Sequence, residues 1–157
     1  DHALTNLSDL AFKSTGIKMN EIIHGGAAGG IAATLRTFLN AEIMNGGEHF
    51  LQITGFKESL KNANLLITGE GSLDEQTLQG KGPFAVAKYA KEKGIPVIGL
   101  AGKVPLMDHP GMNKYFDLLL AIGNQPTDLE TAMKYTASNL IRTSITVGRF
   151  LTLSKSI

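Results

Sequence analysis

Apolar positions near the start of the chain recur with the spacing of an α-helix. Four of them mark one helical face: Leu4, Leu7, Leu10 and Ala11. The run ends at Ser14-Thr15-Gly16, a composition typical of helix C-termini, because glycine readily adopts the left-handed conformation that follows many last turns. The pattern predicts a helix over about residues 3–15.

Glycines then open a second helical pattern. Residues 24–30 read His-Gly-Gly-Ala-Ala-Gly-Gly, and the apolar residues from Ile31 to Leu39 follow one helical face. This order predicts a glycine-rich loop that enters a helix. After a break at Asn45-Gly46-Gly47, a weaker helical periodicity runs to Leu60. Residues 1–62 are therefore predicted to be a mostly helical segment.

Near residue 63 the pattern changes from helical periodicity to short apolar runs. Leu65–Thr68 is a strand-sized run that ends at Gly69, and residues 96–101 form a second such run. Between them, Pro83 opens a helical pattern that Lys93-Gly94 closes. Strand, helix and strand in this order predict a β-α-β unit with parallel strands. Residues 63–157 are therefore assigned to an α/β domain.

The last part of the chain predicts a third strand and a long helix. The apolar run over residues 116–122 is strand-sized, and apolar positions from Leu129 to Leu151 follow one helical face. Thr127 and Glu130 have the spacing of a capping box, with Thr127 as the N-cap. We therefore expect one continuous final helix that begins after Thr127.

Composition indicates a globular domain and excludes several classes of site. The chain has 157 residues, of which 43% are hydrophobic and 18% charged, enough to bury a core of its own. A net charge of +1 gives no overall field that favours nucleic acid or a membrane surface as partner. The chain has no cysteine, which excludes disulfides and thiolate chemistry and indicates a cytoplasmic location.

The first residues suggest that the chain is part of something longer. It begins Asp1-His2-Ala3-Leu4, without an initiator methionine or the architecture of a signal peptide. We therefore expect a fragment of a longer protein. The longest apolar run, residues 118–122, is far below the roughly 20 residues that a spanning helix needs, so no transmembrane segment is expected.

The strongest candidate for chemistry is the polar, glycine-rich stretch between the first predicted strand and the helix after it. Open α/β sheets bind ligands outside the carboxyl ends of their strands, where this stretch lies. Gly69 and Gly71 allow close backbone approach. The carboxylates of Glu70 and Asp74 can hold a cation or accept a proton, and Lys81 adds positive charge at a helix N-terminus. These ingredients suit phosphoryl transfer. A solvated surface loop is the alternative interpretation.

Familiar motifs do not fit this stretch. A Walker A loop requires glycine at position 75 and a hydroxyl after Lys81, but these positions hold Glu75 and Gly82. The dinucleotide pattern G-x-G-x-x-G fails because Asp74 replaces its third glycine and would repel a pyrophosphate. Ser72 lacks the setting of a nucleophile elbow, and the four histidines lack metal-ligand spacing.

The glycine run at residues 25–30 is a second candidate. Successive backbone N–H groups at the start of a helix can bind an anion. Small neighbours such as Ala27, Ala28 and Ala32 equally favour close packing of helices. Both interpretations stay open, and neither excludes the other.

One long stretch of the sequence resembles a known family. The run Leu66-Ile67-Thr68-Gly69-Glu70-Gly71, followed by Asp74, Gln76-Thr77 and Gly80-Lys81, resembles the type I glycerate kinase family of bacteria. The similarity continues through Pro83 and residues 96–102 and extends back to the glycine run, so it covers nearly the whole chain. Family members are longer, and this chain resembles their carboxyl-terminal part. It departs from them at Ser72, where members commonly carry arginine, and at Phe84-Ala85.

The resemblance implies a fold, cofactors and a site. It implies a flavodoxin-like parallel three-layer lobe and an inserted lobe that includes residues 1–62, with the site between the two lobes. It implies ATP and Mg²⁺ as cofactors and D-glycerate as substrate. The candidate catalytic residues are Asp74, Lys81 and Glu70, and Asp74 is also the candidate Mg²⁺ ligand. The candidate substrate- or nucleotide-binding residues are Gly69, Gly71, Ser72, Gln76, Thr77, Gly80, Gly26, Gly29 and Gly30.

We therefore interpret the chain as the carboxyl-terminal part of an ATP-dependent glycerate kinase, which phosphorylates D-glycerate to phosphoglycerate. Because the resemblance places part of the site on segments absent here, the chain alone is expected to be inactive. The alternative is a non-catalytic domain that binds phosphate or another anion, or a partner protein. The sequence leaves open which hydroxyl is phosphorylated, which carboxylate is the base, and whether the protein is a homo-oligomer.

Overall fold

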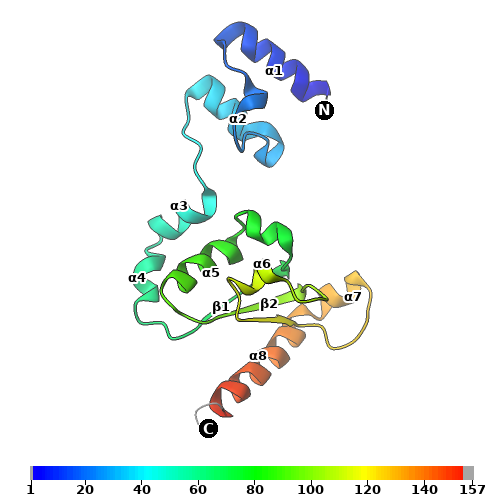
Figure 1. Cartoon of the computed structure of the whole chain (residues 1–157). Coiled ribbons are helices and arrows are strands. Elements are labelled where there is room, and N and C mark those ends of the chain that lie inside the picture. Colours follow the sequence, from blue (N-terminus) through cyan, green and yellow to red (C-terminus); the bar gives the residue numbers. More distant parts are fainter. Residues whose placement is uncertain (1, 154–157) are drawn as a thin grey trace. The chain divides into compact units, whose positions relative to one another are not determined.

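The chain forms two compact units. The computed structural model describes residues 2–153, and its contacts divide into Asp1–Asn45 and Gly46–Ile157 (Figure 1). Helices α3 (Gly46–Ile53) and α4 (Phe56–Leu60) therefore belong to the second unit, whereas the change of pattern in the sequence lies near residue 63. The assignment of residues 1–62 to an inserted lobe stays a prediction.

The first unit is helical, as the sequence predicts. Helix α1 (His2–Thr15) has the expected bounds, and the turn η1 (Met19–Glu21) leads from it to α2 (Ala27–Leu39). The core of this unit is small: it consists of the buried Ala11, Met19 and Ala33, with the half-buried Leu7 and Ile22 packed against them.

The glycine run gives α2 an irregular start. Ala28, Gly29 and Gly30 have φ angles of 50°, 73° and 90°, so regular helical turns begin only after Gly30. An alanine in this left-handed region costs roughly 1–2 kcal/mol. Gly25 has a packing role, because a Cβ there would lie 2.9 Å from the Ile22 carbonyl oxygen. The packing interpretation of the run therefore holds at Gly25.

The second unit is an α/β fold. Strands β1 (Leu66–Ser72), β2 (Val97–Lys103) and β3 (Leu118–Ala121) form a parallel sheet in the order β1-β2-β3. The remaining elements are η2 (Glu75–Gln79), α5 (Gly82–Glu92), α6 (Pro110–Asn113), α7 (Leu129–Lys134) and α8 (Thr136–Leu153). The α/β class, the β-α-β unit and the third strand are confirmed.

Helices cover both faces of the central strand, with α5 and α8 on opposite sides of the sheet (Figure 1). Val97 and Ala101 of β2 join the core on the α5 side. Ile98 and Leu100 pack on the other side with Val147 of α8. Successive strand residues point to opposite faces. Because both faces of β2 are covered, its sequence is an apolar run without polar alternation.

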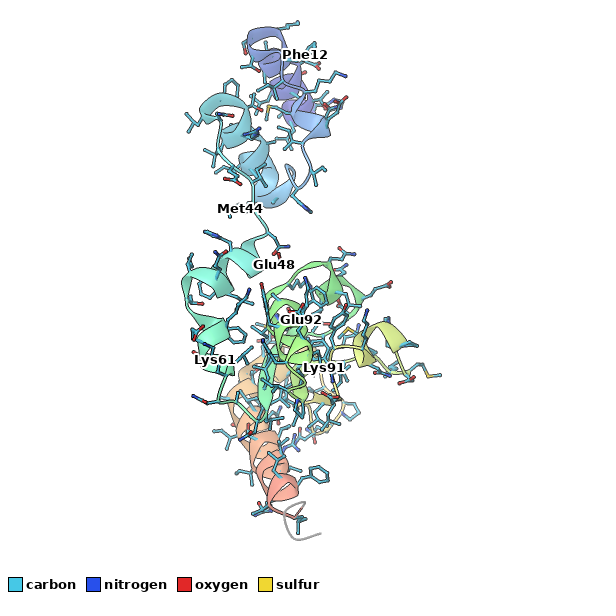
Figure 2. The ribbon with its side chains drawn as sticks, turned by 60° about the vertical axis from the view of Figure 1, so that its left-hand side comes forward. Phe12, Met44, Glu48, Lys61, Lys91 and Glu92 are labelled. Atoms are coloured by element: carbon cyan, nitrogen blue, oxygen red, sulfur yellow. The ribbon has the colours of Figure 1, made fainter. Side chains whose placement is uncertain are left out.

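Helix α3 is attached to α5 by an ion pair. The Lys88 ammonium lies 2.8 Å from Glu48 Oε1, and Figure 2 labels Glu48 on α3. The hydrogen bond and the charge of Lys88 hold the pKa of Glu48 below its usual range. Leu51 on α3 and Leu60 on α4 are also buried. Apolar contacts therefore hold both helices in this unit, and α3 has the ion pair in addition.

Strand β1 is longer than predicted because its glycines are extended rather than turned. The sequence ends the strand at Thr68, but the structure continues it to Ser72. A Cβ at Gly69 would collide with the backbone carbonyl oxygen of Leu100 on β2. Glycine at position 69 therefore permits the close approach of two strands, and the approach of a ligand is not needed to explain it.

Gly69→Ala is expected to lower the free energy of unfolding by about 1–3 kcal/mol, because the added methyl must displace the backbone of β2. Gly71→Ala is the matched control, since a Cβ there meets nothing within 4 Å. Urea unfolding followed by tyrosine fluorescence checks the prediction, because Tyr89, Tyr115 and Tyr135 all belong to the second unit. Equal midpoints for the two variants would contradict it.

The end of the chain differs from the predicted single helix. Residue Tyr135 separates α7 from α8, and the N-cap of α7 is Asp128 rather than Thr127. The Asp128 carboxylate accepts hydrogen bonds from the Thr131 amide at 2.8 Å and the Thr131 hydroxyl at 2.9 Å. The prediction of Thr127 as N-cap is therefore wrong by one residue. Within residues 2–153, no helix is both long and apolar enough to cross a membrane.

Asp128→Ala is expected to lower the urea midpoint of the tyrosine signal, whereas Thr127→Ala leaves it unchanged. The amide and hydroxyl of Thr131 hold the pKa of Asp128 below its ordinary value of 3.8. A depressed carboxyl pKa contributes stability above the unfolded-state pKa, and that contribution disappears as the pH falls through the folded-state value. The difference between wild type and Asp128→Ala should therefore vanish at strongly acidic pH; a difference that persists there would argue against the cap.

Asp117 joins β2 to the residues before β3. Its Oδ2 accepts the Val97 amide proton at 2.7 Å, and its own amide donates to the Val97 carbonyl at 2.9 Å. Its Oδ1 lies 2.7 Å from the ammonium of Lys91, which is labelled on α5 in Figure 2. Burial raises the pKa of Asp117, but the bonds from Lys91 and Val97 outweigh burial and hold it below the usual range.

Candidate active site

The candidate site is the segment that follows the extended part of β1. Ser72 ends the strand, η2 begins after two further residues with Asp74 as its N-cap, and Lys81 precedes α5; Figure 1 labels β1 and α5. Leu73 at the start of the segment is fully buried in the core on the α5 side. The buried side chain anchors the segment at the carboxyl edge of the sheet, the position at which parallel α/β sheets bind ligands.

Asp74 is held by its neighbours in the ionised form. As the N-cap of η2, it accepts the Ser72 hydroxyl proton at Oδ2 and the Gln76 amide proton at Oδ1, both at 3.0 Å. The pKa of Asp74 lies below its usual range, chiefly because of the Ser72 hydrogen bond, with smaller contributions from the Gln76 amide and the charge of Lys81. The carboxylate is therefore a fixed negative charge at neutral pH.

Glu70 is joined to the same network through Thr77. The Thr77 hydroxyl donates to Glu70 Oε1 at 2.7 Å and accepts the Asp74 amide proton at 3.1 Å. The backbone N–H of Thr77 also bonds the Asp74 carbonyl at 2.9 Å. Asp74 and Thr77 thus form the capping box of η2. Glu70 is bonded to this box through the Thr77 hydroxyl.

Lys81 stands at the N-cap of α5 with an exposed side chain. Within residues 2–153 its ammonium lies in none of the ion pairs of the structure. Gly80 before it has a φ of 104°, a conformation that favours glycine, so this glycine is needed for the turn that places Lys81. The positive charge of Lys81 helps to lower the pKa of Asp74.

A pocket of about 410 Å³ lies between the segment 72–75 and the segment 103–109 that follows β2. Lys103 is paired in register with Ser72, and His109 caps α6 by accepting the Met112 amide proton at Nδ1, 3.2 Å away. Sequence reasoning missed Lys103, Asp108 and His109 as pocket residues. The signal was available, because the carboxyl ends of neighbouring parallel strands meet at one edge.

The structure gathers most of the predicted site residues in one place. Gly69, Glu70, Gly71 and Ser72 lie on β1, and Asp74, Gln76, Thr77, Gly80 and Lys81 follow it. Ser72, Asp74, Thr77 and Glu70 are joined by hydrogen bonds. Gly26, Gly29 and Gly30 belong to the first unit, where Gly26 and Gly30 line a separate pocket of about 290 Å³ with Asp9 and Asn20.

Fold and site together define an α/β protein that carries two carboxylates and a lysine in one segment at the carboxyl edge of a parallel sheet. A family model described as the glycerate kinase family matches residues 1–152. The chain is 33% identical over 157 residues to a glycerate kinase of Bacillus subtilis, covering 100% of the chain and 41% of that relative. It is 32% identical to a glycerate 2-kinase of Escherichia coli, covering 98% of the chain and 40% of that relative.

A solved structure agrees with these sequence matches. The crystal structure of a protein from Salmonella typhimurium LT2, assigned as a glycerate kinase 2, superposes with a TM-score of 0.68 at 34% identity, covering 100% of the chain and 40% of that protein. The chain belongs to the glycerate kinase family, which confirms the resemblance found in its sequence. It spans about two fifths of the length of these relatives.

Proposed function

We propose that the chain supplies part of the active site of a glycerate kinase, an enzyme that transfers the γ-phosphoryl group of ATP to a hydroxyl of D-glycerate. Family membership supports the reaction class, and the names of the relatives support the substrate. The observation that carries the proposal is the Asp74 carboxylate, which hydrogen bonds from Ser72 and Gln76 hold at the carboxyl edge of the sheet.

The two carboxylates suit different roles. In this reaction a glycerate hydroxyl oxygen bonds to the γ-phosphorus, the bond from that phosphorus to the ADP oxygen breaks, and the hydroxyl proton passes to a base. A lowered pKa makes Asp74 a weak base but a good fixed charge. We assign Glu70 as the proton acceptor, because Thr77 occupies only its Oε1. Lys81 would stabilise the charge on the transferring group.

The carboxylates also suit the binding of Mg²⁺, which kinases hold through one or two protein carboxylates together with substrate phosphates. The part of the chain that the structure describes contains no group of three or more acidic, histidine or cysteine side chains arranged for a metal. Mg²⁺ needs only one or two protein carboxylates when substrate phosphates and water complete its coordination. Asp74 is the residue that would hold it, and the ion would neutralise phosphate charge.

The proposal is tested with the chain alone and with a chimera, in which this chain replaces the matching segment of the Bacillus subtilis glycerate kinase. We expect the chimera to consume ATP only when D-glycerate is present and to form phosphoglycerate. We expect the 157-residue chain alone to show no turnover. The chain alone is checked for folding by its tyrosine signal.

Two outcomes would contradict the proposal. A folded chimera that binds ATP without glycerate-dependent turnover would favour the alternative of a non-catalytic anion-binding domain. Turnover by the chain alone would show that no other segment is needed for the site, contrary to the expectation from the resemblance. The parent Bacillus subtilis enzyme, assayed in parallel, shows that the assay detects the reaction.

A further inference from the structure

A single buried hydroxyl connects the side-chain carboxylate of Glu70 to the backbone of Asp74. The side chain of Thr77 has 0% exposure. A hydroxyl has one proton to donate and lone pairs to accept with. Here the proton goes to Glu70 Oε1, and a lone pair receives the backbone N–H of Asp74. An amide N–H can only donate, so the direction of both bonds is fixed.

Burial changes the role that the sequence suggests for this residue. The resemblance places Thr77 among the residues that contact substrate or nucleotide, but a side chain with no exposed surface touches no ligand in this structure. We infer that Thr77 is a positioning residue, which fixes the Glu70 carboxylate relative to Asp74. The inference rests on the proposed function, since it explains how the proposed proton acceptor, Glu70, is held in place.

The Glu70 carboxylate needs such a restraint. Glu70 has a long side chain with several freely rotating bonds, and ordering it is costly in entropy. Asp74 is restrained by Ser72 and Gln76, whereas Thr77 is the partner that the structure gives Glu70. Without this bond, the Glu70 carboxylate would lose the hydrogen bond that restrains its direction.

The residue type suits this role. Thr77 is β-branched, which limits its χ1 rotamers and so limits the directions in which the hydroxyl can point. Valine has nearly the same shape and branching but no hydroxyl. Serine keeps the hydroxyl and loses the methyl group. These two substitutions therefore separate the hydrogen bonds of Thr77 from its packing.

The first test uses the chimera. Thr77→Val is expected to lower kcat by roughly 10- to 100-fold while KM for D-glycerate and for ATP changes little, because misplacement of a reacting group acts on the chemical step. Thr77→Ser is expected to recover most of kcat. In a Glu70→Gln background, Thr77→Val should cause little further loss, because Thr77 acts through that carboxylate. A merely structural role would instead reduce activity by the same factor in both backgrounds.

The second test needs no activity and uses the 157-residue chain. Amide hydrogen exchange measured by NMR should show the Asp74 amide protected in wild type and in Thr77→Ser. In Thr77→Val its exchange should be at least about 10-fold faster, with the amides of β2 unchanged. Equal exchange in all three forms, or kcat of Thr77→Val within 2-fold of the parent chimera, would overturn the inference. An inactive wild-type chimera would refute the proposed function and leave the exchange result to decide the role of Thr77.

Discussion

Asp74→Asn in the chimera is expected to lower kcat by roughly 10²-fold or more. The amide keeps the size of the side chain and removes its negative charge, so it would weaken the proposed binding of Mg²⁺. The Ser72 and Gln76 bonds to Asp74 both end on carboxylate oxygens, and the substitution replaces one of these acceptors with a donor. Steady-state kinetics with saturating ATP and D-glycerate measure the effect.

The control for this variant is Glu92→Gln, which removes a carboxylate from the far end of α5 without touching the candidate site. Its kcat should match that of the parent chimera. The result that would contradict this role is near-normal turnover of Asp74→Asn, with folding verified by the tyrosine signal. The segment after β1 would then be interpreted as a solvated loop. The kinase assignment would then rest on family membership alone.

Lys81→Ala in the chimera is expected to lower kcat and kcat/KM together, by roughly 10²–10³-fold. In the proposed role, the positive charge of Lys81 would stabilise the negative charge that develops on the transferring group in the transition state. Loss of a contact made equally in the ground state would mainly raise KM. Complete Michaelis–Menten curves for both substrates separate these two outcomes.

Lys93→Ala is the matched control, because Lys93 stands at the C-cap of α5 while Lys81 stands at its N-cap. Both substitutions remove one exposed ammonium group from the same helix, so a general effect of net charge would appear in both. A rise in KM for ATP with kcat unchanged in Lys81→Ala would show that the lysine only binds the nucleotide. That result would contradict its role in the transition state.

The order of elements was predictable because each apolar run matches the period of one type of element. The run at residues 96–101 is buried on both faces, and the structure makes it β2 with both faces covered. The helix that opens at Pro83 is also present, because proline is tolerated in a first turn. Such signals are local, and local propensity agrees with the fold at these positions.

The errors occur where a distant contact decides the local structure. Gly69 signals a turn in the sequence, but the carbonyl of Leu100, far along the chain, makes glycine necessary inside a strand. Asp128 and Thr127 are both good N-cap residues. Asp128 is the one that bonds Thr131 in the structure, and residue type alone does not decide between the two. The break at Tyr135 has no glycine or proline to announce it.

The candidate site was predictable as a list of residues but not as an arrangement. Glu70, Asp74 and Lys81 were found because their chemistry and their place after a strand are visible in the sequence. The burial of Thr77 was not visible in the sequence, where Thr77 was expected to contact a ligand; in the structure its hydroxyl bonds the Glu70 carboxylate and the Asp74 amide. Burial depends on the packing of η2 against α5 and α6, and such packing needs the tertiary structure.

The two-way bonding between Asp117 and Val97 bears on how this part of the fold tolerates insertions and deletions. A one-residue slip between parallel strands would turn every side chain of one strand to the wrong face. The carboxylate and amide of Asp117 both form hydrogen bonds with Val97, so they set the register of β2 with β3 directly. The intervening residues 104–116 therefore need not set this register. Lengthening or shortening the exposed tip at Leu106 and Met107 would reshape the adjoining pocket and leave the strand alignment intact.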